Sequence, residues 1–165
     1  MSDNYYWNLR KLVGKIPLNI SSAGVIILDK KNRILLQHRT DDGSWSIPGG
    51  GLGLGENLEA GAKREVYEET NLIVEDIKLF NVYSGKEQHC IYPDGNEVYF
   101  TNVVYITKNF EGEMKADGIE GSELKFFNFD SLPKNIAPCS KPILQDLKIK
   151  LKSAKKSSLN SRDLY

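Results

Sequence analysis

The sequence predicts an α/β protein in which a mixed sheet lies between layers of helices. Three observations support this prediction. Runs rich in Val, Ile, Tyr, Phe and Thr alternate with turn sequences, as strands do. Helical patterns occur early, in the middle and late in the chain. The chain has 165 residues and 40% hydrophobic content, which suffices for one domain with a sizeable core. Strands interspersed with helices in this way are typical of a sheet covered on both faces.

The first elements are a short helix and two strands. Residues 5–13 are predicted to be helical, and we expect their Trp, Leu and Val side chains to pack on the body of the protein or on a second subunit. Residues 18–28 are a predicted strand that ends in a turn at 29–32, and residues 33–39 are its predicted hairpin partner. The apolar N-terminal segment and the strand edges leave a homodimer open.

A helix over residues 58–70 is the most strongly predicted element. Asn57 is a good N-cap, because its side-chain oxygen can accept from a free N–H of the first turn. The segment that follows contains no proline and consists mostly of good helix formers.

The second half of the chain continues with strands and a closing helix. Strands are predicted over 73–83, 97–107 and 124–129, and a helix over 141–152. We expect one domain over residues 1–152, within which 1–17 form an N-terminal extension. Residues 153–165 are expected to be a loose tail.

The composition limits the classes of partner. Lys plus Arg and Asp plus Glu are balanced at 22 each, so the chain has no basic field for gripping long nucleic acid, and a small nucleotide suits it better. An apolar run of the roughly 20 residues that span a bilayer is absent, as are the features of a signal peptide, so we expect a cytoplasmic protein without a membrane partner. Cys90 and Cys139 form no C-x-x-C pair, and reduced thiols are expected.

Three glutamates share one side of the helix over residues 58–70. At about 100° per residue, Glu65, Glu68 and Glu69 fall within an arc of about 100°. The apolar residues overlapping that arc are Leu58, Ala62 and Val66. The solvent side would instead hold Glu59, Lys63, Tyr67 and Thr70. Like charges one turn apart repel, and crowding them beside apolar surface adds to the cost, unless a divalent cation neutralises them. Oxygen ligands without a Cys/His cluster favour Mg²⁺ or Mn²⁺ over zinc. Incidental crowding on a charged helix is the alternative for the triplet alone.

The glutamates belong to a longer pattern, G-x5-E-x7-R-E-U-x-E-E-x-G-U, in which U is apolar. The matching residues are Gly50, Glu56, Arg64, Glu65, Val66, Glu68, Glu69 and Leu72. This pattern resembles the Nudix box and departs from it only at Asn71, where the family has Gly. Asn tolerates the left-handed conformation next best after Gly, so we expect the C-cap of the helix to be preserved. Residues 45–50 also resemble the strand and turn that lead into the box.

The resemblance extends over most of residues 18–150. It implies an α/β/α sandwich with a mixed, largely antiparallel central sheet. It also implies metal-dependent hydrolysis of a pyrophosphate bond in a nucleoside diphosphate linked to another moiety, by attack of water on phosphorus. ADP-ribose-like compounds and (deoxy)nucleoside triphosphates are the main substrate options.

The resemblance also implies roles for single residues. Glu65 and Glu69 would be the principal metal ligands, and Glu68 a further ligand or the base that activates water. Arg64 would orient the glutamates through charge-assisted hydrogen bonds and, with Glu65 and Glu68, form the catalytic group. The other assigned positions are Glu56 as support of the loop, Gly50 and Asn71 as structural residues, and the Gly49 carbonyl as an additional ligand.

Some members recruit one more acid from a loop after the box. Glu120 is the preferred candidate here, followed by Glu123 and Glu97. A solvated loop acid is the alternative interpretation.

Substrate contacts are assigned to three residues outside the box. Arg39 follows a strand and could donate in a bidentate manner to a substrate phosphate, or form a surface ion pair. Trp45 and Tyr83 could stack on a nucleobase, as could Tyr92 and Phe127, although such aromatic residues more often belong to the core.

Two other functions compete with hydrolysis. A nucleotide-sensing module would keep the fold without turnover, but such modules usually have a damaged box. An isoprenoid diphosphate isomerase would need a suitably placed catalytic Cys and Glu, which Cys90 and Cys139 support poorly.

Overall fold

The structure is a computed structural model that describes residues 5–157, with side chains up to Ser153. Its helices are α1 (Tyr5–Val13), α2 (Leu58–Thr70) and α3 (Lys141–Ser157). The strands are β1 (Leu18–Ile27), β2 (Ile34–Arg39), β3 (Trp45–Ser46), β4 (Gly49–Gly51), β5 (Lys78–Tyr83), β6 (His89–Ile91), β7 (Glu97–Thr107) and β8 (Gly121–Phe127). Short 3₁₀ turns are η1 (Lys86–Gln88), η2 (Phe129–Ser131) and η3 (Pro138–Ser140).

The strands form two sheets. The larger has the order β4-β1-β7-β5, with β6 also paired to β7, and the smaller has the order β3-β2-β8. Only the pairing of β1 with β7 is parallel among the strand pairs of the described residues. The expected mixed, largely antiparallel arrangement is therefore confirmed, although it is divided between two sheets.

The predicted hairpin of the first two strands is wrong. The chain does turn at 29–32, where Asp29 accepts from the N–H groups of Lys31 and Arg33. Beyond a single bridge between Leu28 and Ile34, however, β1 and β2 lie in different sheets. Both strands bury side chains on both faces, so each is an interior strand that needs partners from distant parts of the chain.

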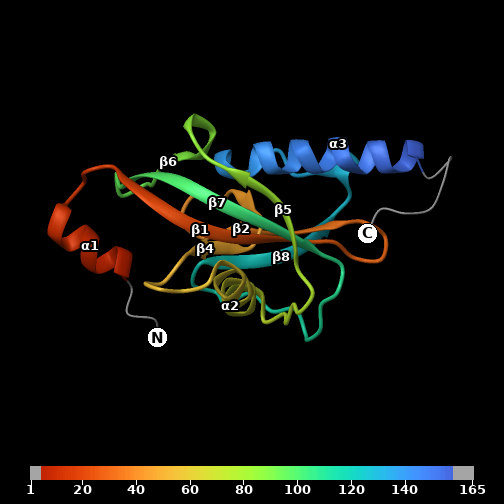
Figure 1. The fold of residues 1–165 in the computed structure, drawn as a ribbon, viewed down its shortest axis with the longest axis horizontal. Coiled ribbons are helices and arrows are strands. Elements are labelled where there is room, and N and C mark those ends of the chain that lie inside the picture. Colours follow the sequence, from red (N-terminus) through yellow and green to blue (C-terminus); the bar gives the residue numbers. More distant parts are fainter. Residues whose placement is uncertain (1–4, 158–165) are drawn as a thin grey trace.

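Helices cover the sheets on two sides, with α3 on one side and α2 on the other (Figure 1). One core cluster packs Ile143, Leu144 and Leu147 of α3 against side chains of β1 and β2, including Leu36. The other packs Ala62 and Val66 of α2 against the opposite side. This arrangement agrees with the expected α/β/α sandwich.

Replacing the fully buried Leu36 by alanine tests the first core. We expect the free energy of unfolding to fall by about 2–5 kcal/mol, because the change removes buried methyl groups and leaves a cavity. Leu79, which is 62% exposed on β5, is the matched control, and its replacement by alanine should cost no more than about 0.5 kcal/mol. Equal losses in urea-induced unfolding of the two variants would contradict the core assignment.

The ends of several elements differ from the prediction. The strand predicted from residue 73 begins only at Lys78. Ile73 itself forms an isolated bridge with Glu111 and is not part of the strand. Strand β8 begins at Gly121 rather than at residue 124. The closing helix continues to Ser157, so the first five residues of the expected tail are helical, and 158–165 lie outside the described residues. None of the described helices is both long and apolar enough to span a bilayer.

Helix α1 has its predicted bounds but does not contribute to the core, and the alternative of packing on a second subunit stays a prediction. No residue of α1 is buried, and Trp7 and Leu12 are 57% and 85% exposed. The amphipathic pattern therefore does not mark a core helix.

Thr70 of α2 was predicted on the solvent side of its helix, and it is buried. Its carbonyl accepts from the N–H of Lys115, so the chain that follows covers this part of the helix.

Candidate active site

The caps of α2 set the position of its glutamates. The Asn57 side chain accepts from the N–H of Glu59 at 2.9 Å and of Ala60 at 3.4 Å. At the other end, Asn71 is left-handed, with φ 59° and ψ 16°, and its N–H donates to the carbonyl of Tyr67. Both predicted caps are confirmed, because each depends only on local backbone geometry.

The three glutamates differ in their exposure. Glu69 is 3% exposed, the side chain of Glu65 is 12% exposed, and that of Glu68 is 55% exposed. The predicted arc therefore does border the buried side of α2, with Glu69 deepest and Glu68 facing solvent.

The glycines of β4 bring backbone against these carboxylates. The N–H of Gly49 donates to Glu69 Oε2 at 2.8 Å. Gly50 lies so close to Glu65 that a Cβ there would be 2.5 Å from Oε2. Gly49 itself has a φ of +148° and backbone packed against Gly24. Glycine is therefore required at 49 for the approach to β1 and at 50 for the approach to Glu65.

Arg64 connects the acids with one another. Its guanidinium donates to both oxygens of Glu56 at 2.7 and 2.8 Å, to Glu65 Oε1 at 2.7 Å and to Glu68 Oε2 at 3.1 Å. A fifth contact reaches the carbonyl of Gly51 at 3.2 Å. The hydrogen bonds from Arg64 hold the pKa of Glu56 below its usual value. Arg64 thus has the geometry of an orienting residue, and Glu56 anchors it.

The carboxylates lie in an electrostatically unfavourable group. Burial, together with the neighbouring Glu65 and Glu120, raises the pKa of Glu69 to about 8 against hydrogen bonds from Gln37 and Gly49. Burial also raises the pKa of Glu65, although Arg64 opposes the rise. A negative charge on these groups is therefore costly without a counterion.

These residues fit a divalent cation by the chemistry of their donors. Glu69 accepts from amide groups, whereas the guanidinium of Arg64 is shared among three other acids. A cation among Glu65, Glu69 and Glu120 would relieve their mutual repulsion, and carboxylate oxygens suit Mg²⁺ or Mn²⁺. Among the described residues, no group of three or more His, Cys, Asp or Glu side chains is arranged so that it could already hold a metal ion.

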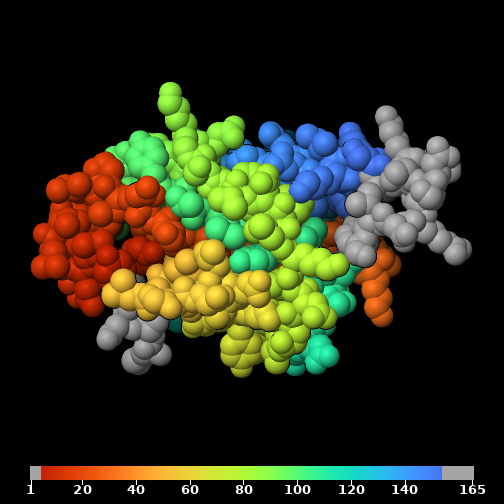
Figure 2. All heavy atoms as spheres, viewed as in Figure 1, coloured from red at the N-terminus to blue at the C-terminus, as the bar shows by residue number. Residues whose placement is uncertain are grey.

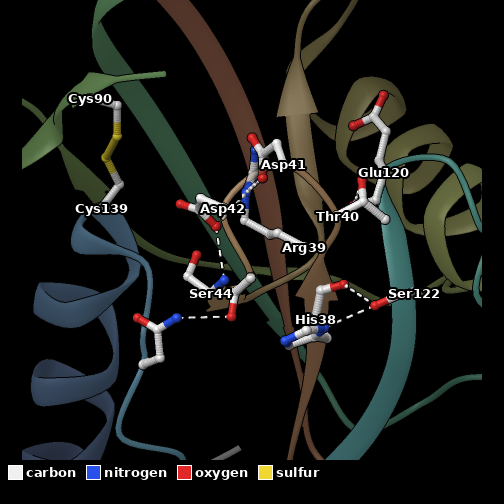
Figure 3. A network of polar contacts seen from close by, with 12 residues as sticks. His38, Arg39, Thr40, Asp41, Asp42, Ser44, Cys90, Glu120, Ser122 and Cys139 are labelled. Carbon is white, nitrogen blue, oxygen red and sulfur yellow. Dashed lines mark hydrogen bonds and ion pairs between the residues drawn. A yellow bond between two sulfur atoms is a disulfide. The ribbon is translucent and has the colours of Figure 1, made fainter. Parts of the chain in front are cut away.

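Glu120 is held beside this group by its loop. Asp117 accepts from the N–H groups of Ile119, Glu120 and Gly121. Thr40 ties the loop to the end of β2, since its N–H donates to the Glu120 carbonyl at 3.0 Å (Figure 3). Partial burial, followed by the charge of Asp117, raises the pKa of Glu120.

The two other candidate loop acids lie in strand pairs. Glu97 binds His89 at 2.8 Å, and Glu123 is opposite His38. Of the three candidates, Glu120 is therefore the one with a place beside the helix glutamates.

A cleft of about 450 Å³ lies beside Glu120 and beside the β4 glycines that contact the helix glutamates. Gly49, Gly50 and Glu120 line one part of it, and η3, the β6–β7 hairpin and α1 line other parts. Its size falls within the range of small-molecule sites.

Arg39 lines the cleft and is already paired. Its guanidinium donates to both carboxylate oxygens of Asp41, at 2.9 and 2.5 Å, and lies 3.9 Å from Asp42. It also lies over the ring of Tyr92, 6.0 Å from the centroid. In the view of Figure 3, Arg39 and its two aspartates lie between the disulfide and Glu120. The ion pair, one of the two alternatives for Arg39, therefore exists, and the residue also lines the cleft.

Trp45 and Tyr83, two of the predicted substrate contacts, do not lie at the cleft. Trp45 packs edge-on against Phe127, with ring centroids 4.8 Å apart, and Tyr83 is buried with its hydroxyl donating to Asp146 at 2.9 Å. Both belong to the core beneath α3 and neither lines the cleft. Tyr92 does line it. Alternation along a strand cannot tell which of two covered faces holds a ligand. The sequence therefore could not distinguish aromatic residues of the core from those that line the cleft.

The expectation of reduced thiols is also wrong in this structure. Cys90 and Cys139 form a disulfide that joins β6 to η3, at the side of the cleft (Figure 3). The two residues are 49 positions apart in the chain, and only the fold places them together. With both thiols used, neither is available as the catalytic cysteine that an isomerase would need.

Sequence reasoning missed Gln37. This side chain is buried on β2, and its interaction with Glu69 opposes the rise in the pKa of that carboxylate. A signal was present, since a buried strand reads Leu-Leu-Gln, and a polar residue in such a run needs a partner.

Comparisons with known proteins agree with the fold and the box. Residues 18–147 match the NUDIX domain family. The chain is 36% identical over 111 residues to an ADP-ribose pyrophosphatase of Methanocaldococcus jannaschii, across 66% of this chain and 62%, less than two thirds, of that protein. It is 32% identical over 126 residues to a putative 8-oxo-dGTP diphosphatase of Bacillus subtilis, across 76% of this chain and 78% of that protein.

A solved structure leads to the same result. The MutT NUDIX hydrolase from Burkholderia pseudomallei is similar with a TM-score of 0.67 and 25% sequence identity, over 78% of this chain and 98% of that one. The sandwich, the capped glutamate helix and the matched residues 18–147 therefore agree, and the chain belongs to the Nudix family.

Proposed function

We propose that the protein hydrolyses a pyrophosphate bond in a nucleoside diphosphate linked to another moiety, in a reaction that requires Mg²⁺ or Mn²⁺. The observation that carries this proposal is the group of glutamates beside an open cleft, in which the buried Glu69 and Glu65 accept hydrogen bonds from Gly49 and Arg64. The similarity to an ADP-ribose pyrophosphatase and to a putative 8-oxo-dGTP diphosphatase supports the same two substrate classes. The domain, expected over residues 1–152, would extend to the end of α3 at Ser157.

Glu65 and Glu69 would hold the cation, with Glu120 and the Gly49 carbonyl as further ligands. The contact between Gly49 N–H and Glu69 supports this set, because it places residue 49 next to the deepest carboxylate. When bound, the ion would neutralise the diphosphate and lower the pKa of attacking water. Arg39 would contact a phosphate from the cleft side, while its aspartates limit its charge.

Glu68 is the base in this proposal. It is the most exposed of the three helix glutamates, so water can reach it, and Arg64 orients it by one hydrogen bond. Glu68 would accept a proton from water as the water oxygen bonds to one phosphorus. The bridging P–O bond would break, and the other phosphate would leave with the bridging oxygen.

Product release from a panel of compounds tests the proposal. The panel contains ADP-ribose, dinucleoside polyphosphates, nucleotide sugars and nucleoside triphosphates, each with and without Mg²⁺ or Mn²⁺. We expect metal-dependent cleavage of at least one class, and ¹⁸O from labelled water should appear in one product only. Measurable binding of nucleotide without turnover of any compound would favour a sensing module instead.

A further inference from the structure

Helix α1 lies outside the matched residues 18–147, yet it forms a wall of the cleft. Its cleft-lining residues are Tyr6, Trp7 and Arg10. In Figure 2, the residues of α1, in red, lie at one end of the molecule beside the loop that follows β4. This helix has no role in the core, because none of its residues is buried.

The contacts of α1 show that its position is built into the fold. The hydroxyl of Tyr6 donates to the carbonyl of Ser21 at 3.1 Å. The Tyr6 ring packs so closely on Gly51 that a Cβ at residue 51 would lie 2.6 Å from it. At the end of α1, Arg10 donates to the carbonyls of Ile16 at 2.7 Å and Glu97 at 3.2 Å. The helix is thus attached to both β4 and the start of β7.

The floor of the same cleft has unused hydrogen-bonding groups. Ser22 and Ser46 both line the cleft and are at least nine-tenths buried. Their hydroxyl oxygens have no hydrogen-bond partner among the described residues. Buried polar groups are normally paired, so these hydroxyls indicate a ligand with donors and acceptors of its own. Asn102, which is opposite Ser22 in the β1–β7 register, adds an amide to the lining.

We propose that α1 is a specificity element that binds the base of a nucleoside, with Trp7 as the stacking residue. The proposal rests on the proposed function, since the glutamates beside the other part of the cleft would bind the diphosphate through a divalent cation. An aromatic wall above a polar floor suits a planar base with a hydrogen-bonding edge and a sugar with hydroxyls. The half-exposed Trp7 keeps ring surface accessible for this contact.

Tryptophan fluorescence provides a binding test that does not require turnover. The chain has two tryptophans, and Trp45 is packed against Phe127 away from the cleft. We would titrate the protein with AMP, GMP, CMP and UMP, with and without Mg²⁺, and with ribose 5-phosphate as the base-free control. At least one monophosphate should change the fluorescence of the wild type but not of Trp7→Phe, and ribose 5-phosphate should change neither.

Calorimetry and kinetics then measure the contribution of the ring. We expect Trp7→Ala to bind that monophosphate about tenfold more weakly and to raise KM by a similar factor, with kcat within about twofold. Trp7→Phe should stay within about threefold of the wild type. Leu12→Ala removes an exposed side chain of the same helix that does not line the cleft, and should change neither quantity.

Two results would overturn the inference. One is equal affinity of the wild type and Trp7→Ala for every monophosphate, and the other is the absence of any Trp7-dependent fluorescence change across the set. Failure of turnover with retained Trp7-dependent binding would instead count against hydrolysis and leave the base site standing.

Discussion

Replacing Glu69 by glutamine is expected to lower kcat/KM about a thousandfold while leaving the fold intact. Glutamine has nearly the same shape and can still accept from the N–H of Gly49. It cannot supply the negative charge that holds a divalent cation, and such ions contribute several kcal/mol to catalysis of this kind, at about 1.4 kcal/mol per factor of ten. Because the buried carboxylate is costly to charge, the metal-free variant should melt no lower than the wild type.

Initial rates over a range of Mg²⁺ and Mn²⁺ concentrations measure the first effect, and thermal melting measures the second. Added Mn²⁺ should raise the melting temperature of the wild type by mass action and have little effect on Glu69→Gln. Glu59→Gln changes an exposed glutamate in the first turn of α2 and is the matched control. Full activity of Glu69→Gln would remove Glu69 from the metal site.

Gly50→Ala is expected to lower kcat/KM at least about a hundredfold without unfolding the protein. The added Cβ would lie 2.5 Å from Oε2 and 2.7 Å from Cδ of Glu65, so that carboxyl group must move. A side-chain end can move where backbone cannot, and Gly50 does not have a positive φ, so the fold should tolerate alanine. A displaced ligand costs several kcal/mol of stabilisation in the transition state.

Two neighbouring glycines make this prediction specific. Gly53→Ala would place its Cβ 3.5 Å from Glu56 Oε2, an ordinary contact, and should keep kcat/KM within about threefold. Gly49→Ala would bring a Cβ within 2.4 Å of Gly24 Cα, so it should disturb the sheet itself. Circular dichroism separates the two kinds of loss. Wild-type rates in a folded Gly50→Ala variant would show that Glu65 need not occupy its position.

The most reliable sequence-based predictions concern α2. Its bounds, its caps at Asn57 and Asn71 and the shared side of its glutamates follow from interactions within a few residues. The resemblance to the box also implied that Arg64 would orient the glutamates, and Arg64 does contact Glu65 and, one helical turn away, Glu68. Such contacts depend on helix geometry and not on the rest of the chain.

The sequence pattern could not predict which distant segments of the chain pair with one another. Strands β1 and β2 are buried on both faces along much of their length, so alternation could not show that they belong to different sheets. For the same reason, Trp45 and Tyr83 were assigned to substrate contacts and lie in the core. Trp7 was expected to pack on the body or on a second subunit, and in the structure it lines the cleft. The Cys90–Cys139 disulfide likewise depends on the contact of β6 with η3.

The sequence by itself therefore determined the family resemblance, the glutamate helix and the donors suited to a hard divalent cation. The tertiary structure alone decided which face of each strand the cleft occupies, that the Gly49 N–H holds Glu69, and that α1 lies at the cleft. The physical reason is the distance along the chain between the residues that interact. Helix caps and one-turn neighbours are set by local geometry, whereas a cleft is formed by segments that meet only when the sheets pack.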